Sequence, residues 1–259
     1  MKYVFWGVYL WIVGWSVDTF AQKNKRLTIK VMSYHINHGI NENDQTNLTR
    51  VAELIKNHKP HLVALQDLDS GVVRTGRLHQ LRILSLLTGY DFVFDKATEG
   101  NGEKNGLGIL SKFPIEARQR LPLPNPENTP TRILQCALVA LPNNQYLRFC
   151  NTELDDFSPL NRGLQAAVVN EALQYSIQPV ILAGNFNVQP LDHSLEALTK
   201  YWNDAGEKTI GGTYPITGKR IDYIWTLKNA KLKLKDYTVL YEPFTSEHYP
   251  VLAIYSLEK

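Results

Sequence analysis

The feature that most constrains the fold is a series of short apolar runs, each of which ends in a cluster of polar residues. Four of them read "VMSYHINHG", "LVALQDLD", "QYLRFCNTE" and "PVILAGNFN". Short runs that alternate, or that are apolar throughout, predict strands of a buried sheet. Between them lie segments with apolar residues at helical spacing. A chain with many strands and a few intervening helices favours packed sheets with helices outside them.

Four segments predict the helices. They read "DQTNLTRVAELIKNHKP", "GRLHQLRILSLLTGY", "SPLNRGLQAAVVNEALQYS" and "LDHSLEALTKYW". Pro60 and Gly89 are typical of the end of a helix and close the first two. No internal repeat, low-complexity stretch or Gly/Ser linker interrupts the pattern. We therefore expect one domain over residues 26–259.

The polar clusters at the strand ends contain the residue types of a catalytic site. They are His35 to His38, Gln66 to Asp69, Asn151 to Glu153, Asn185 to Asn187, Asp222 within a strand, and Glu247–His248 before the last strand. Each cluster alone is more simply a solvated strand end. Strand ends gather at one rim of a sandwich, however, and the joint set of His, Asp, Glu and Asn predicts a site for a divalent metal and a phosphate there.

The N-terminus predicts export. "MKYVFWGVYLWIVGWSV" has the basic residue Lys2 before an apolar run, and small Ala21 precedes Gln22. This pattern is typical of a signal peptide over residues 1–21. The alternative is a membrane anchor, but the run has about fifteen residues, fewer than the roughly twenty that span a bilayer. We expect a periplasmic or secreted protein with no membrane span after cleavage.

The two cysteines leave two alternatives open. Cys136 and Cys150 lie on segments that predict a hairpin about the turn "PNN", which would bring them close together. Export permits a disulfide between them. Because disulfides between adjacent strands are geometrically awkward, two buried thiols are at least as well favoured.

Composition limits the class of partner. The 259 residues, 44% of them hydrophobic, suffice for one large core. The net charge is +3, which is too small to indicate binding of long nucleic acid or of an anionic membrane surface. We expect a monomer that meets a phosphoester substrate or ligand.

Seven stretches in order carry a resemblance. They are "VMSYHINHG", "LVALQDLD", "GLGILSKFPI", "NTELDD", "ILAGNFN", "RIDYIW" and "SEHYPV". From about Leu27 to its end the chain resembles the endonuclease/exonuclease/phosphatase superfamily. The resemblance implies a four-layer α/β/β/α sandwich of two mixed β-sheets with outer helices. It also implies hydrolysis of phosphate esters by in-line attack of water, with a divalent metal, most often Mg²⁺, offsetting charge on the phosphate.

Several residues match the motifs of the superfamily. The resemblance implies that Asn187 hydrogen-bonds the nucleophile or the phosphate, and that Asp222 and His248 form a pair that contacts the phosphate. Asn151 also matches. Arg162, on the long helix after the fourth motif, is similarly placed in the sphingomyelinase-like branch. Asn151 and Arg162 are therefore predicted to bind substrate.

Five positions depart from the motifs. They are His35 for Asn, Asp67 for Glu, Glu153 for His, Asn185 for Asp and Glu247 for Asp. Asn37, two residues after His35 and on the same face of a continued strand, is a further predicted substrate contact. His35, Asp67 and Glu247 remain the predicted metal ligands. The nitrogen of His35 would move the preference from Mg²⁺ toward Mn²⁺ or Zn²⁺.

The departure at Asn185 bears most directly on catalysis. An amide can orient water but cannot accept its proton, and a general base contributes roughly 10²–10⁴-fold. Glu153 is the candidate for a displaced base. Two hypotheses follow. One is an exported, metal-dependent phosphoesterase with an altered site. The other is a catalytically impaired pseudoenzyme that uses the sandwich to bind a phosphorylated or sugar-like ligand.

Overall fold

The computed structural model describes residues 27–40 and 46–258. The predicted signal peptide, residues 1–21, lies outside this range. Within the described residues, no helix combines the length and the apolar character needed to cross a membrane.

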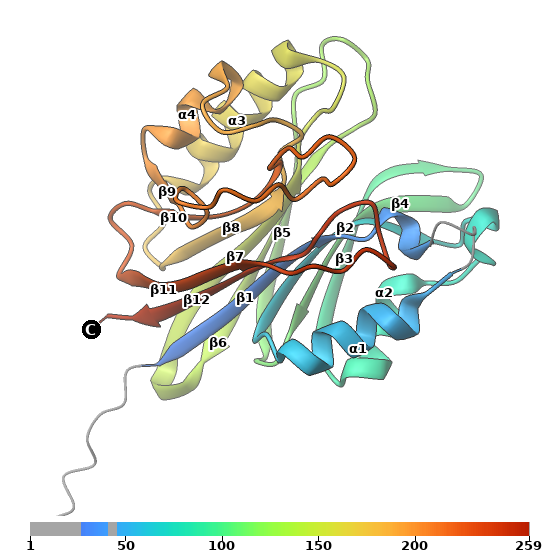
Figure 1. Ribbon diagram of the computed structural model, residues 1–259, viewed down its shortest axis with the longest axis horizontal. Coiled ribbons are helices and arrows are strands. Elements are labelled where there is room, and N and C mark those ends of the chain that lie inside the picture. Colours follow the sequence, from blue (N-terminus) through green and yellow to red (C-terminus); the bar gives the residue numbers. More distant parts are fainter. Residues whose placement is uncertain (1–26, 41–45, 259) are drawn as a thin grey trace, which may run out of the picture.

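Two six-stranded mixed sheets form the centre of the molecule (Figure 1). The first has the order β11-β12-β1-β2-β4-β3 and consists of β1 (Thr28–His35), β2 (Leu62–Ser70), β3 (Asp91–Gly100), β4 (Glu103–Ser111), β11 (Leu232–Val239) and β12 (Val251–Leu257). The second has the order β5-β6-β7-β8-β10-β9 and consists of β5 (Ile115–Pro122), β6 (Ile133–Leu141), β7 (Gln145–Glu153), β8 (Val180–Asn185), β9 (Trp202–Asp204) and β10 (Asp222–Leu227). Among the strands of residues 27–40 and 46–258, only β1–β2 and β7–β8 pair in parallel.

The helices lie outside the sheets, as the sequence predicts. They are α1 (Leu48–His58), α2 (Gln80–Thr88), α3 (Pro159–Leu173) and α4 (Glu196–Thr199), with short 3-10 turns η1 (Asn37–Gly39), η2 (Val73–Thr75), η3 (Pro142–Asn144) and η4 (His193–Leu195). Gly89 ends α2 in the left-handed region at φ 74°, a conformation in which glycine meets no steric penalty. Ser158 caps α3 by accepting a hydrogen bond from the backbone N–H of Asn161. The last predicted helix is short because Trp202 already pairs with Leu227 in the sheet.

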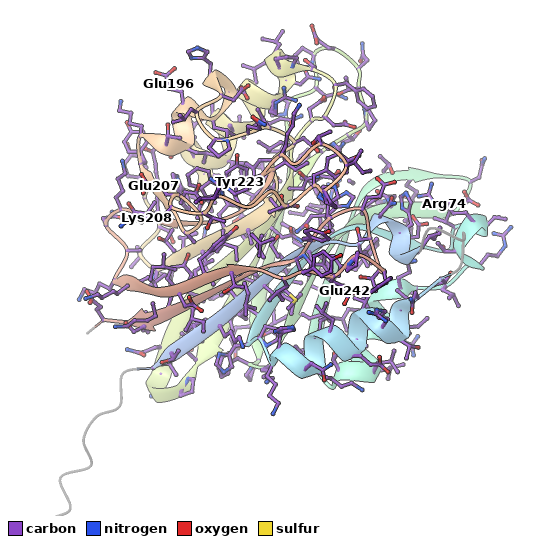
Figure 2. All side chains as sticks on the ribbon, in the orientation of Figure 1. Arg74, Glu196, Glu207, Lys208, Tyr223 and Glu242 are labelled. Carbon is purple, nitrogen blue, oxygen red and sulfur yellow. A yellow bond between two sulfur atoms is a disulfide. The ribbon has the colours of Figure 1, made fainter. Side chains whose placement is uncertain are left out.

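Three apolar clusters separate the four layers, and side chains fill the space between them (Figure 2). One lies between the sheets and joins residues such as Val31 of β1 to Phe149 of β7. The second packs α3 and α4 on the outer face of the second sheet. The third packs α1 and α2 on the outer face of the first. The predicted α/β/β/α sandwich is confirmed.

Alternation along the strands explains where the site forms. Side chains two residues apart share a face of a sheet. The faces that meet between the sheets read Ile29, Val31, Ser33 and His35 on β1, then Leu147, Phe149, Asn151 and Glu153 on β7, and Ile181, Ala183 and Asn185 on β8. The same face is thus apolar for most of each strand and becomes polar at its end. The inter-sheet core therefore gives way to a polar site at one rim.

Cys136 and Cys150 form a disulfide. They are direct partners in the antiparallel pair β6–β7, with Cα atoms 4.1 Å apart, and lie in the cluster under α3. The alternative of two buried thiols is therefore wrong. The hairpin about Pro142–Asn144 places the two residues directly opposite each other, where strand neighbours approach most closely.

Candidate active site

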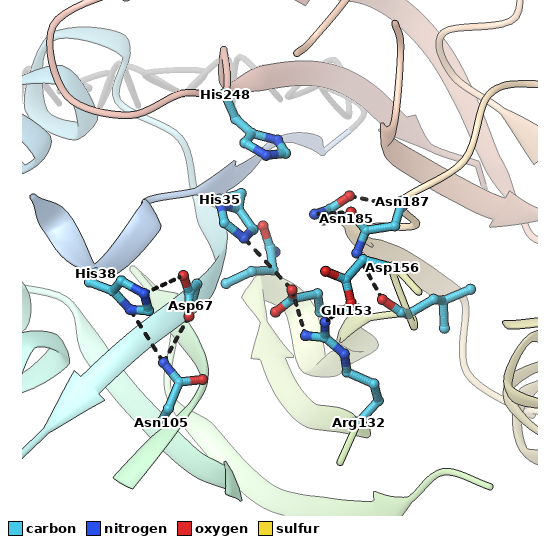
Figure 3. Close-up of polar contacts among 12 residues, drawn as sticks. His35, His38, Asp67, Asn105, Arg132, Glu153, Asp156, Asn185, Asn187 and His248 are labelled. Carbon is cyan, nitrogen blue, oxygen red and sulfur yellow. Dashed lines mark hydrogen bonds and ion pairs between the residues drawn. The ribbon is translucent and has the colours of Figure 1, made fainter. Parts of the chain in front are cut away.

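A cleft of about 620 Å³ opens at the polar rim between the sheets. Its wall includes His35, His38, Asp67, Arg74, Asn105, Arg132, Glu153, Asp156, Asn185, Asn187, Lys219, Glu247 and His248. Eight segments far apart in the sequence supply these residues, and five of the six predicted strand-end clusters contribute a side chain to the lining. Figure 3 shows how the side chains face one another.

Glu153 lies at the centre of this cleft, between two basic side chains (Figure 3). Its Oε1 atom is 2.5 Å from Nη1 of Arg132 and 3.7 Å from Nε2 of His35. The second Arg132 nitrogen, Nη2, donates to Oδ1 of Asp156 at 2.9 Å. The side chains of Arg132, Glu153 and His35 are only 11–13% exposed, so solvent screens these charges weakly.

These contacts favour the charged forms of both His35 and Glu153. Burial disfavours the His35 cation, but its contact with Glu153 and the charges of Asp67 and Asp222 raise the pKa of His35 to about 9. Burial likewise opposes the Glu153 anion, but the charge of Arg132 and the contact with His35 lower the pKa of Glu153 to about 2. At neutral pH, His35 is therefore an imidazolium and Glu153 a carboxylate.

His248 is held by a second buried carboxylate. Its Nδ1 atom lies 2.9 Å from Oδ2 of Asp222, and its ring stacks on that of His35. Ser246 Oγ accepts a hydrogen bond from the backbone N–H of His248 and donates one to the carbonyl oxygen of His35. The loop before β12 is thereby fixed to the end of β1. The Asp222–His248 pair, predicted by resemblance, is present as a contact.

Asn185 and Asn187 hold each other at the end of β8. Asn185 Nδ2 donates to Asn187 Oδ1 at 3.0 Å, and the backbone N–H of Asn187 donates to Asn185 Oδ1 at 2.9 Å. Asn187 Nδ2 donates to the carbonyl oxygen of Leu154. Gly184 permits this arrangement, because a Cβ there would collide with the carbonyl oxygen of Thr152 on β7. Both amides therefore face the cleft in a fixed orientation.

Asp67 belongs to a separate polar cluster on the first sheet. It lies within the register shift between Leu65 and Leu68 and adopts φ 59°. Its carboxylate lies 3.1 Å from His38 Nε2 and accepts a hydrogen bond from Asn105 at 2.8 Å.

Asp69 holds the residues around Asp67 in place through its buried carboxylate. Its fully buried carboxylate accepts two hydrogen bonds from Arg74, each of 2.8 Å. Burial opposes the charge, but hydrogen bonds from His38, Arg74 and Asn105 hold the pKa of Asp69 well below its usual range. Asp69 therefore keeps Arg74 and His38 in place beside Asp67.

The predicted site residues fall into two groups. Those that line the cleft are His35, Asp67, Glu153, Asn185, Asn187, Glu247 and His248, and Asp222 lies directly behind His248. The lining, as far as the chain is described, does not include Asn37, Asn151 or Arg162. Asn37 lies elsewhere because β1 ends at His35 and the chain turns into η1, so the two residues do not share a strand face.

Asn151 and Arg162 are engaged in hydrogen bonds inside the protein. Asn151 accepts from Gln66 Nε2 at 2.7 Å and donates to the carbonyl oxygens of Leu65 and Gly108, so it joins the two sheets beneath the cleft. Arg162, 7% exposed on α3, donates to the carbonyl oxygen of Asp155 at 2.7 Å. In this structure both residues hold the scaffold of the site.

Sequence reasoning missed Arg132 and Asn105. Arg132 precedes β6, and its hairpin partner β7 ends at Glu153, so the open end of the hairpin brings the two together. The predicted hairpin could have revealed this pair. Asn105 on β4 carried no such signal, because its contact with Asp67 depends on the register shift in β2.

The predicted metal ligands do not form a metal site in this arrangement. Among the described residues, no group of three or more His, Cys, Asp or Glu side chains could hold a metal ion. Asp67 is engaged by His38 and Asn105, and Glu247 is exposed at the cleft wall. The contact with Glu153 raises the pKa of His35 to about 9, so a metal at this histidine would have to displace a proton.

Two face-to-face mixed sheets with outer helices and a polar cleft at their rim define a hydrolase-like α/β sandwich. Residues 32–233 match the model of the Endonuclease/Exonuclease/phosphatase family, and the chain belongs to this family. No curated protein sequence gives a significant match.

Solved structures share the fold at low sequence identity. An endonuclease/exonuclease/phosphatase from Beutenbergia cavernae is 19% identical with a TM-score of 0.77, covering 90% of this chain and 72% of its own. A mannosyl-6-phosphatase from Bacteroides thetaiotaomicron is 22% identical with a TM-score of 0.73, covering 87% and 98%. The catalytic domain of human Nocturnin, with bound sulfate, is 18% identical with a TM-score of 0.69, covering 89% and 96%.

Proposed function

We propose that this protein binds the phosphate group of a phosphorylated small molecule in the cleft, and that its hydrolytic activity is strongly reduced. The observation that carries this proposal is the position of Glu153 between Arg132 and His35. The centre of the cleft is built as an ion pair of the protein's own side chains, and its carboxylate is not free to take up a proton or a metal.

The donors around the cleft suit an oxyanion. Arg132, His248 and the amides of Asn185 and Asn187 all line it, and Lys219 lies on the same wall. The guanidinium of Arg132 and the ammonium of Lys219 are charged donors, and these form the strong hydrogen bonds by which proteins recognise phosphate. Two proteins of the same fold support this class of ligand, since one is named a mannosyl-6-phosphatase and the other was solved with sulfate. A small phosphomonoester is the favoured ligand.

Reduced hydrolysis follows from the candidate bases. The amide of Asn185 cannot accept a proton, and its oxygen already accepts the backbone N–H of Asn187. Glu153, with its pKa lowered to about 2 by Arg132 and His35, is a weak base at neutral pH. The hypothesis that Glu153 acts as a displaced general base is therefore poorly supported.

Phosphoester hydrolysis is the second candidate function. The enzymes of this family generally depend on a divalent metal. The Asp222–His248 contact of 2.9 Å favours this candidate, because it orients His248, which lines the cleft together with the two asparagines. Activity of this kind would require Asp67 to leave His38 and Asn105 before it could hold Mg²⁺, Mn²⁺ or Zn²⁺.

We also propose that the protein acts outside the cytoplasm, as the signal-peptide pattern predicts. The Cys136–Cys150 disulfide supports this location, because structural disulfides persist in oxidising compartments and are rare in the cytosol.

Calorimetric titration with inorganic phosphate and mannose 6-phosphate, in the presence of EDTA, tests the binding proposal. Hydrolysis of p-nitrophenyl phosphate and bis-p-nitrophenyl phosphate is then followed with Mg²⁺, Mn²⁺ and Zn²⁺. We expect binding without metal and very slow turnover with each metal. Rapid metal-dependent turnover would select the second candidate, and no phosphate binding under any condition would refute the first.

A double variant, Asn185→Asp with Glu153→His, sharpens this comparison. It supplies a carboxylate at the end of β8 and removes the one held by Arg132. If the scaffold is intact and only the chemistry is impaired, metal-dependent hydrolysis should rise by about 10²-fold or more. Glu171→Gln, on the exposed face of α3, is the control for altered charge.

A further inference from the structure

We propose that Arg132 is the residue that recognises the ligand phosphate, and that Glu153 is an internal carboxylate that occupies its place until the ligand displaces it. This inference rests on the proposed function and adds to it the recognising residue and its competitor. The ligand class is an oxyanion that can compete with a carboxylate for a guanidinium.

Arg132 has the position and the spare donors for this role. It precedes β6 at the wall of the cleft, with a side chain 13% exposed. Its Nη1 and Nη2 nitrogens bind two different carboxylates, those of Glu153 and Asp156. Its Nε is buried and has no hydrogen-bond partner among the described residues. The planar fork of a guanidinium pairs best with two oxygens of one phosphate or carboxylate group, an arrangement that neither acid provides here.

Glu153 stands where an oxygen of the ligand would be expected. It ends β7 on the face that points between the sheets, and it lines the cleft. One of its two carboxylate oxygens, Oε1, contacts both Nη1 of Arg132 and Nε2 of His35. An oxygen held between a guanidinium and an imidazole nitrogen is in the environment of a bound oxyanion. The Glu153 carboxylate therefore occupies the position in which we expect an oxygen of the ligand phosphate to bind.

The charges explain why displacement is necessary. The two bases, Arg132 and His35, face the two acids, Glu153 and Asp156, so the cluster has almost no charge left with which to attract an anion. A phosphate next to Glu153 would meet like charge at short range. Once Glu153 rotates away, both donors become available. The wild-type protein should consequently bind phosphate weakly, and it should prefer dianions to monoanions.

Substitution of Glu153 by Gln is the direct test. The amide keeps the shape of the side chain and removes the charge, so the ligand competes with a weaker hydrogen bond to Arg132. We expect E153Q to bind inorganic phosphate about tenfold more tightly than wild type at pH 7 in EDTA, measured by calorimetry. Thermal unfolding of each variant checks that it is folded.

Two control variants separate this effect from a general change in charge. Asp156→Asn removes the other carboxylate on Arg132, but the Asp156 side chain is 40% exposed, whereas that of Glu153 is 12% exposed. Because Asp156 is one of the two acids that neutralise the cluster, we expect a gain in phosphate affinity that is smaller than in E153Q and below about threefold. Glu171→Gln, exposed on α3, removes one negative charge far from the cleft and should change nothing. Arg132→Gln should weaken binding and, in combination with E153Q, abolish the gain.

The outcomes distinguish the two proposals. If wild type binds phosphate and E153Q binds it no more tightly, Glu153 is not a competitor and the inference fails while the proposed function stands. If E153Q gains affinity and Arg132→Gln does not remove the gain, Arg132 is not the recognising residue. If no variant binds phosphate, the inference and the proposed function fail together.

Discussion

The imidazole rings of His35 and His248 lie stacked at the cleft, with their centroids 4.2 Å apart and their planes at 24°. Each ring is fixed by its own carboxylate, His35 by Glu153 and His248 by Asp222. The stack therefore joins the two acid–base pairs of the site into one packed unit. A change in the charge or position of either ring should therefore alter the position of the other ring.

The His35–Glu153 pair should make stability depend on pH. In the folded protein the pKa of His35 is raised from 6.5 to about 9, because Glu153 favours its charged form. A raised pKa contributes stability that is complete below pH 6.5 and is lost as the pH rises to about 9. The full contribution is about 3 kcal/mol by linkage. Thermal unfolding between pH 6 and pH 10 should show a melting temperature that falls across this interval.

His35→Asn is the matched variant for this prediction, since Asn does not titrate. Its melting temperature should be lower than that of wild type at pH 6 and should change less between pH 6.5 and pH 9. Parallel pH profiles for the two proteins would show that another group is responsible.

Asp222 should position His248 for the ligand. The carboxylate is 1% exposed and contacts His248 Nδ1 at 2.9 Å. Asp222→Asn keeps the shape and removes the charge that orients the ring. Since a hydrogen bond to a charged group is worth about 1.5–3 kcal/mol, we expect phosphate affinity to fall by about tenfold, measured by calorimetry. Unchanged affinity in a folded D222N protein would exclude His248 from ligand binding in the orientation seen here.

Asn151 should be needed for stability more than for binding. It joins Gln66 on the first sheet to its own strand on the second, and its side-chain nitrogen satisfies the carbonyl oxygens of Leu65 and Gly108. Asn151→Ala leaves these buried groups without partners, so the free energy of unfolding should fall by about 3 kcal/mol. Chemical denaturation measures this. If N151A were as stable as wild type but lost phosphate binding, the earlier prediction of a substrate contact would be right.

The disulfide should contribute measurably to stability. It closes a loop with a sequence separation of 14 residues, for which restriction of the unfolded chain gives about 3 kcal/mol. A Cys136→Ala, Cys150→Ala double variant should unfold at a correspondingly lower denaturant concentration. Wild type in strong reductant should approach the same value. A difference below about 0.5 kcal/mol would indicate that the cross-link does not restrict the unfolded chain.

The sequence predicted the fold and the rim because both depend on local patterns. Alternation along β1 and β8 marks which face of each strand is buried, and it continues to His35 and Asn185. Asn37 was predicted to contact the substrate but does not line the cleft. Alternation holds only while the strand lasts, and η1 begins directly after His35 and Ile36. Strand ends are the positions at which a periodic argument is weakest.

The side chains that contact the predicted residues could not be predicted from local sequence patterns. Glu153 was recognised as an unusual acid, but its neighbour Arg132 lies in a loop and belongs to no motif. Ion pairs across a cleft depend on side-chain rotamers and on register, and the chain encodes these through the whole packing of the sheets. The chemical state of Glu153, which decides between a base and an ion-pair partner, therefore required the structure.

The disulfide also has a consequence for the rate of binding. It joins β6 and β7 four residues after Arg132 and three before Glu153, so the two strands cannot separate at the end that carries the ion pair. A ligand must therefore displace Glu153 by rotation of its side chain, a local motion that does not require the two strands to separate. Opening of a backbone segment would take microseconds or longer. Association should thus be governed by diffusion into the cleft, and ligands should be distinguished by how long they stay.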